Sequence, residues 1–233
     1  MIILVIRCVS RLDLFLYPLG SKRNVLLIYK MEFDESAGYL VIPRNFVDIL
    51  EYLPNPDYVV MNYVYILEGP PLFTYHRDVT SSKTVFRTKY PTYTCIEYDY
   101  DGDFLSVAPS SHKGWTCGLP VTLSGKRGTR ILFDCDLLHG GVGEPVERIA
   151  AQYKIVHRDD LPILKHLEGT TVCKRGTTVS YFTQVWLRVT SYVFAVPIQW
   201  IFLPLLHRQY IGGIYGFFQS LIPINHYNNY KGL

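Results

Sequence analysis

Three side chains with metal-binding chemistry occur in order in the middle of the chain. His76 and Asp78 form a His-x-Asp pair, and His139 follows Asp78 by 61 residues. Two imidazoles and one carboxylate on one face of a metal ion leave three positions of an octahedron open. That arrangement suits non-haem Fe(II), which must hold a co-substrate and O2 together. The pattern therefore predicts an Fe(II) centre in which His76, Asp78 and His139 are the ligands and the catalytic residues.

The local sequence around each ligand supports this prediction. Residues i and i+2 of a strand point to the same face, so His76 and Asp78 would present their side chains together. His139 opens into Gly140-Gly141, where the backbone can pass close to a ligand. A lone His-x-Asp pair is common by chance and a lone His is usually structural. The three residues in this order, within a strand-rich region, are much more specific than any one of them.

Arg148 is the candidate for binding a carboxylate group. In a strand over 148–157, Arg148, Ala150, Gln152 and Lys154 would share one face. An Arg flanked by the small Ala150 could reach into a barrel and hold a carboxylate through two hydrogen bonds. The alternative is a solvated Arg on the strand surface.

The elements that must position these residues are mostly short strands. β-Branched and aromatic runs predict them, separated by regular turn signals that favour a sandwich or barrel. Apolar spacing also predicts a short helix over 42–53, closed by Pro54. The predicted strands are 14–17, 25–29, 58–67, 72–78, 84–88, 92–98, 104–108, 129–133 and 148–157.

Composition narrows the class of protein. The 19 Tyr and 12 Phe suit a β-rich chain, and a net charge of +3 without a long Lys/Arg run gives no footprint for nucleic acid. The five cysteines are scattered without a Cys-x-x-Cys, which favours a reducing compartment over a disulfide framework. The apolar stretch 1–6 has no basic n-region or cleavage site and predicts no secretory signal. We therefore expect the cytoplasmic side of the cell.

A later segment resembles a known family. Asp103–Lys113 (DFLSVAPSSHK) is similar to the G-x-L-x-V-x-P-G-S-H-K segment of the phytanoyl-CoA dioxygenase family, and it lies between the His-x-Asp pair and the distal His, as in that family. The similarity covers about Tyr75 to Asp160. The resemblance implies a double-stranded β-helix, a jelly-roll or cupin-like barrel with flanking helices. It also implies dependence on Fe(II), 2-oxoglutarate and O2.

Carried over residue by residue, the resemblance implies that His76, Asp78 and His139 bind iron. It implies that Arg148 binds the far carboxylate of 2-oxoglutarate, and that a small-molecule substrate is hydroxylated with release of succinate and CO2. The chain departs from the family at Ser110, where Gly is usual, and at Gly141, where Ser is frequent. His112 in the same segment is interpreted as a loop residue with a structural hydrogen bond.

The organisation along the chain is predicted to be an oxygenase domain over 1–160, a polar connector over 161–180 and an apolar tail over 181–233. As a helix, Val185–Leu206 would extend about 33 Å at ~1.5 Å per residue, enough to cross a bilayer. Arg188, Pro197 and Pro204 oppose a spanning helix. Two alternatives stay open: a membrane-associated tail, or a tail packed on the barrel or on a partner subunit.

The sequence favours an Fe(II)- and 2-oxoglutarate-dependent dioxygenase, and the apolar tail makes a lipid-like substrate attractive. A second hypothesis is a non-catalytic cupin-like binding or structural protein with a vestigial metal site. A third is a metal hydrolase that uses the same three ligands. Fold resemblance alone cannot supply the substrate.

Overall fold

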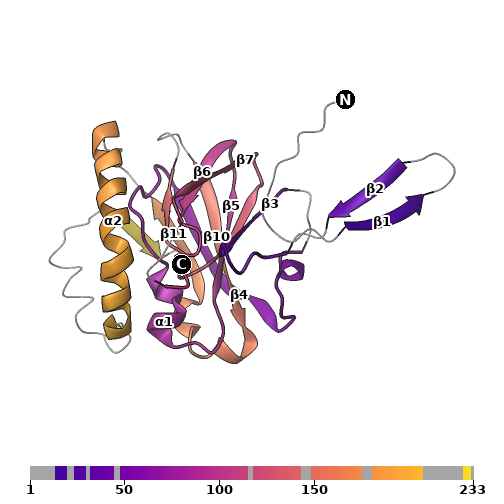
Figure 1. The fold of residues 1–233 in the computed structure, drawn as a ribbon. Coiled ribbons are helices and arrows are strands. Elements are labelled where there is room, and N and C mark those ends of the chain that lie inside the picture. Colours follow the sequence, from indigo (N-terminus) through magenta and orange to yellow (C-terminus); the bar gives the residue numbers. More distant parts are fainter. Residues whose placement is uncertain are drawn as a thin grey trace.

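The computed structural model describes residues 14–19, 24–29, 32–44, 48–114, 118–142, 148–174, 180–206 and 228–231. The stretch 1–6 and the end of the predicted tail, residues 207–227, lie outside the described residues. The fold is mostly β, as the composition predicts. Figure 1 shows most of the strands gathered at the centre, with β1 and β2 apart from them and helix α2 along the opposite side.

Seven strands form the main sheet. Its spatial order is β12-β11-β4-β10-β5-β8-β3, and its pairs are antiparallel except β11 with β4. The long β-branched and aromatic runs make the central strands, as predicted. The members are β3 (Tyr39–Ile42), β4 (Tyr58–Glu68), β5 (Tyr93–Tyr98), β8 (Arg130–Asp134), β10 (Ile149–His157), β11 (Gly169–Lys174) and β12 (Asn228–Lys231).

A smaller sheet packs against one face of the main sheet. It has the order β7-β6-β9, with β6 (Gly102–Val107), β7 (Val121–Gly125) and β9 (His139–Gly141). Apolar side chains from both sheets, among them Phe104, Ile131 and Phe133, form a shared buried cluster. This cluster fixes the position of β9, and therefore of His139, against the main sheet.

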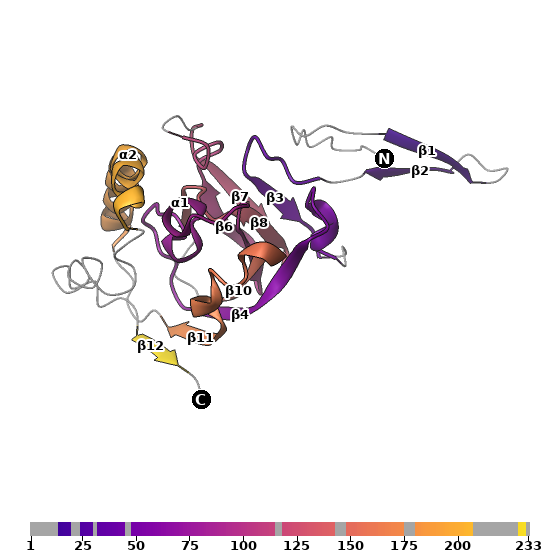
Figure 2. The same ribbon diagram turned by 90° about the horizontal axis from the view of Figure 1, so that it is seen from below.

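The opposite face of the main sheet is covered by the chain that precedes β4. Phe33, Leu53 and Tyr58 pack there against Cys95 and Ile155. Strands β1 (Leu14–Leu19) and β2 (Asn24–Tyr29) confirm the two predicted N-terminal strands. They pair only with each other, away from the two larger sheets (Figures 1 and 2).

Three local predictions are wrong. The predicted strand 72–78 is not formed, because the chain there makes only an isolated β-bridge, between His76 and His139. The predicted strand 84–88 contains helix α1 (Lys83–Phe86), because the Ser82 hydroxyl accepts the Val85 N–H as an N-cap and Arg87 ends the helix in the left-handed region at φ 54°. The predicted helix 42–53 is not formed as such in its described part. Ile42 ends β3, and only the 3-10 turn Leu50–Tyr52 is helical. Further 3-10 turns are Val79–Ser81, Arg158–Asp160 and Lys165–Leu167.

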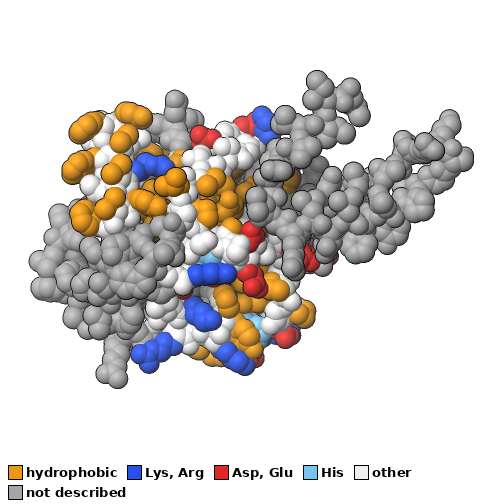
Figure 3. Space-filling model, viewed as in Figure 1, with side chains coloured by type: hydrophobic (Ala, Val, Ile, Leu, Met, Phe, Trp, Pro, Cys, Tyr) orange, Lys and Arg blue, Asp and Glu red, His pale blue; other side chains and the backbone are white. Residues whose placement is uncertain are grey.

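Helix α2 (Tyr181–Leu206) confirms that the apolar segment is helical. No helix in the described part of the chain has both the length and the apolarity needed to cross a bilayer. The helix exposes apolar side chains along one stripe, including Phe182 (79% exposed) and Trp186 (61% exposed). Figure 3 shows hydrophobic side chains in orange over the part of the surface where α2 lies.

The predicted connector contains an element of the main sheet. Strand β11 lies within residues 161–180 and pairs in parallel with β4, with Thr171 opposite Tyr65. Parallel pairing between strands far apart in the chain leaves little local signal. A polar strand next to the edge of the sheet therefore resembles a linker in the sequence. The boundaries 1–160, 161–180 and 181–233 themselves stay predictions.

Candidate metal centre

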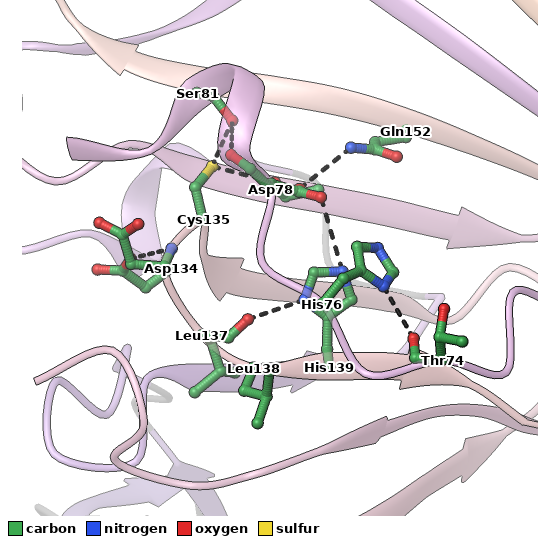
Figure 4. Close-up of polar contacts among 12 residues, drawn as sticks. Thr74, His76, Asp78, Ser81, Asp134, Cys135, Leu137, Leu138, His139 and Gln152 are labelled. Atoms are coloured by element: carbon green, nitrogen blue, oxygen red, sulfur yellow. Dashed lines mark hydrogen bonds and ion pairs between the residues drawn. The ribbon is translucent and has the colours of Figure 1, made fainter. Parts of the chain in front are cut away.

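His76, Asp78 and His139 converge between the two sheets. One ligand atom from each residue, a ring nitrogen or a carboxylate oxygen, lies within 4.8 Å of the other two. His139 Nε2 is 3.6 Å from Asp78 Oδ1, and the two imidazole rings are 4.4 Å apart between centroids. Figure 4 shows the three side chains turned toward one another. This is the convergence that the sequence predicts.

The two histidines are held by direct backbone pairing. His76 and His139 form an antiparallel bridge, with N–O distances of 2.8 and 2.9 Å in the two directions. Each ring also donates from Nδ1 to the carbonyl two residues earlier: Thr74 for His76 (3.0 Å) and Leu137 for His139 (2.8 Å). Because a carbonyl only accepts, Nδ1 carries a proton in both rings, and the neutral form of each ring has its lone pair on Nε2, where a metal can bind.

The two oxygens of Asp78 have different surroundings. Oδ2 accepts hydrogen bonds from Thr94 Oγ1 (2.5 Å), Lys154 Nζ (2.7 Å) and Gln152 Nε2 (3.3 Å). Burial alone would raise the pKa of Asp78, but the charge of Lys154 and then the two histidines hold that pKa well below its usual value. Asp78 is therefore an ionised carboxylate, the form that binds metal.

His139 and Lys154 are both buried, but His139 is neutral and Lys154 is positively charged. Burial, reinforced by the neighbouring His76, lowers the pKa of His139 to about 4, so its imidazole is neutral at pH 7. Burial would also lower the pKa of Lys154, but the Asp78 carboxylate raises it above its usual value. Asp78 therefore lies between a neutral ring at Oδ1 and an ammonium group at Oδ2.

Arg77 points away from the ligands and anchors the segment that carries them. Its Nη1 donates to the backbone carbonyl of Asp136, and its side chain is buried. Asp78 N donates to the carbonyl of Cys135 at 2.9 Å. These contacts fix the His-x-Asp segment against the turn between β8 and β9, from which His139 follows.

Glycines 140 and 141 serve the packing of β9 against the chain before His76. A Cβ at Gly141 would lie 2.5 Å from Pro71 Cβ, and one at Gly140 would lie 3.1 Å from the Thr74 carbonyl oxygen. The sequence predicts a close approach to a ligand, whereas the structure shows a close approach to the neighbouring backbone. This packing also explains why Ser is absent at position 141.

Helix α2 packs beside the ligand-bearing segments. Ser191 Oγ accepts the Tyr75 N–H (2.8 Å), and Arg188 donates to the Gly141 carbonyl (3.1 Å) and the Tyr75 hydroxyl (3.3 Å). The rings of Tyr75 and Tyr192 meet edge to face, 5.3 Å apart between centroids. The helix therefore contacts the residue before His76 and the second residue after His139.

Arg148 lies just before β10 and is buried. Its Nε donates to the Gly69 carbonyl (2.7 Å), and its charge opposes the burial that raises the pKa of Tyr100. The structure does not place Arg148 in the group formed by the three ligands. Its role toward a carboxylate remains a prediction.

His112 lies apart from the ligand group. Its Nε2 donates to the Glu35 carbonyl at 3.0 Å, and its ring packs closely against Gly38. The interpretation of a loop histidine with a structural hydrogen bond is confirmed.

The residues that the sequence does not single out are those around Asp78 Oδ2. Thr94 on β5 and Lys154 on β10 are direct partners in the strand register, and Gln152 reaches the same oxygen from the same face of β10. Period-2 alternation already places Gln152 and Lys154 on the face of Arg148. It does not reveal that this face meets Asp78, because that depends on the register between strands.

The donor set fits a divalent transition metal. Two imidazole Nε2 atoms and one carboxylate oxygen are the ligands that Fe(II), and also zinc, accept. Bonds of about 2 Å to each would require only small movements of side chains that are within 4.8 Å of one another.

Comparisons with known proteins give structural similarity alone. No family model matches the chain, and no curated protein matches it. Among solved structures, EvdMO1 is similar with a TM-score of 0.36 and 16% identity, over 47% of this chain and 29% of that one. The alignment therefore spans less than a third of EvdMO1.

Two other solved structures cover more of their own chains. SnoK, a non-heme alpha ketoglutarate dependent carbocyclase from nogalamycin biosynthesis, has a TM-score of 0.35 and 14% identity, over 52% of this chain and 79% of that one. HygX from Streptomyces hygroscopicus, with iron bound, has a TM-score of 0.34 and 14% identity, over 53% and 83%. Since TM-scores of this size support no assignment of activity, the function must be argued from the side chains.

Proposed function

We propose that this chain is an Fe(II)- and 2-oxoglutarate-dependent dioxygenase with a double-stranded β-helix core. The observation that carries the proposal is the convergence of His76, Asp78 and His139, which come from two segments joined by a backbone bridge. Their protonation states support it, because both rings offer Nε2 and the carboxylate is ionised. Such a facial set leaves positions for a chelating keto acid and for O2.

Each of the three ligands has a defined role in the proposed mechanism. His76 and His139 would bind Fe(II) through Nε2, and Asp78 through its carboxylate. When bound, the metal with 2-oxoglutarate and O2 supplies the oxidising chemistry that hydroxylates a substrate and gives succinate and CO2. The chain contributes ligand orientation, while the two sheets and α2 limit the access of water.

Arg148 is proposed to hold the far carboxylate of 2-oxoglutarate. It is a buried guanidinium at the start of β10, and the following residues on its face, Gln152 and Lys154, reach Asp78. A planar guanidinium can donate two parallel hydrogen bonds to a carboxylate. The variant Arg148→Gln should weaken 2-oxoglutarate binding at least about tenfold and leave metal affinity unchanged.

The substrate is proposed to be a small molecule on the cytoplasmic side. The described cysteines Cys95, Cys135 and Cys173 are free and buried, which is consistent with reducing conditions. Apolar side chains on α2, beside the ligand-bearing segments, make a lipid-like compound the first class to test.

The test is succinate formation by the purified chain supplied with Fe(II), 2-oxoglutarate and O2. The wild type and His112→Ala, a histidine outside the ligand group, should both form succinate, and His76→Ala should not. Turnover that needs neither O2 nor 2-oxoglutarate would indicate a hydrolase instead.

One observation favours a second candidate, a non-catalytic protein with a vestigial site. Lys154 already neutralises Asp78, so the carboxylate is satisfied before any metal binds. Metal binding by the wild type without succinate formation, over a range of added substrates, would support this alternative.

A further inference from the structure

The ion pair between Lys154 and Asp78 is unusual for a carboxylate that binds metal. The lysine side chain is 1% exposed, and its Nζ contacts Asp78 Oδ2 (2.7 Å), Thr94 Oγ1 (2.7 Å) and Cys135 Sγ (3.7 Å). Register pairing of β10 with β5 holds Lys154 opposite Thr94. The ammonium group is therefore built into the sheet behind the ligand group.

The two oxygens of the Asp78 carboxylate have different hydrogen-bond partners. A carboxylate has about four acceptor sites over its two oxygens. The short bonds from Thr94 and Lys154 occupy Oδ2, and Gln152 adds a third donor. Oδ1 instead faces Nε2 of His139 at 3.6 Å, on the side of the other ligands. Only Oδ1 is left to approach a metal.

We infer that Lys154 is a positioning residue that restricts Asp78 to a single metal bond through Oδ1 and lowers the affinity of the site for divalent cations. This inference rests on the proposed metal centre. Partners that bind the second oxygen of a ligand carboxylate fix its orientation. A buried positive charge behind the carboxylate also repels the incoming cation through a medium of low dielectric constant.

The ion pair between Lys154 and Asp78 also affects how the charge of a bound metal ion is balanced. The two imidazole ligands bring no negative charge to the site, and the charges of Asp78 and Lys154 cancel. A metal ion in this set of groups keeps its double positive charge for an anionic co-substrate. The anionic co-substrate, more than the protein, would therefore balance the charge of the metal ion.

The experiment compares the affinity of the full chain for Mn(II), measured anaerobically by EPR of the free ion. Lys154→Met keeps the length of the side chain and removes its charge, so the dissociation constant should fall at least about tenfold. Thr94→Val is the matched control: it removes one hydrogen bond to Oδ2 and one acceptor of the Lys154 ammonium, but keeps the positive charge and its contact with Asp78. The constant should change less than about threefold.

Each outcome decides a separate question. An unchanged or weaker affinity in Lys154→Met, or the same tightening in Thr94→Val, would overturn the role of Lys154 and leave the metal centre standing. If the wild type binds neither Mn(II) nor Fe(II), both the centre and the inference fail.

A second measurement on the wild type keeps the inference testable if Lys154→Met does not fold. A crystal structure with Mn(II) should show one Asp78 oxygen on the metal and Lys154 Nζ still hydrogen-bonded to the other. Two metal–oxygen bonds from Asp78, or a lysine turned away from it, would contradict the inference.

Discussion

Asp78 and Asp134 are two interior carboxyl groups in adjoining segments, yet their chemistry differs. Asp78 contacts the Lys154 ammonium directly and has a lowered pKa. Asp134 lies beside Asp136, and burial together with that second carboxyl group raises its pKa to about 7. Arg77 acts on Asp134 but does not offset the burial. The direct contact with a cation thus explains why Asp78 is ionised and can bind metal, while Asp134 stays partly protonated.

The largest expected effect comes from removing the ligand carboxylate. Asp78→Ala would leave the Lys154 ammonium buried without its partner, at a cost of about 3–5 kcal/mol in the free energy of unfolding. Urea denaturation of the metal-free protein measures this. His76→Ala also removes a ligand but no charge partner, and should cost much less. Equal losses in the two variants would contradict the role assigned to the ion pair.

The second prediction concerns the pH dependence of Asp134. Because its folded pKa is raised from 3.8 to about 7, the folded state binds more protons than the unfolded state between these values. Stability should therefore fall as pH rises through this window, by about 1 kcal/mol per pH unit. Asp134→Asn should remove this loss and be more stable at pH 7, on the order of 2–3 kcal/mol.

The measurement is the difference in unfolding free energy between wild type and Asp134→Asn from pH 4 to pH 8. His139 has the opposite effect, because its lowered pKa makes the unfolding free energy rise from about pH 4 to 6.5. This contribution is the same in both proteins and cancels in the difference. Asp78 acts in the more acidic range, where its stabilisation is lost as pH falls. A difference that does not change with pH would refute the assignment to Asp134.

The smallest expected effect comes from substituting Ser82, which contacts Asp136, the neighbour of Asp134. Its hydroxyl donates to Asp136 Oδ1 and accepts the Val85 N–H at the start of α1. Ser82→Ala should cost about 1 kcal/mol in unfolding free energy, the usual value of a lost cap. Mn(II) affinity should be unchanged, and a large change would show that the two carboxyl regions are coupled through the His-x-Asp segment.

Much of the fold followed from local pattern, and the errors have physical causes. The central strands β4, β5 and β10 were predictable because long β-branched and aromatic runs have one clear preference. The strand predicted over 84–88 was wrong because one N-cap at Ser82 outweighs the four β-favouring residues of that segment. Strand β11 was missed because its partner β4 is distant in sequence.

The candidate site divides in the same way. The convergence of His76, Asp78 and His139 was predictable because two histidines and one aspartate in this order, within a strand-rich region, favour a shared metal site. Lys154 and Thr94 carry no such signature, since Lys and Thr on strands are ordinary surface residues. Their importance follows from a register between β5 and β10 that no local pattern specifies.

The sequence by itself determined which side chains could bind a metal, because residue type and order are local properties. Strand alternation did not place them, since 76–78 is not a strand and only His76 makes a β-bridge there. The tertiary structure alone decided that His139 pairs with His76 and that Lys154 lies behind Asp78. Those meetings depend on how sheets pair and pack. Pairing energy comes from contacts between distant residues, so the register is fixed only when the whole core assembles.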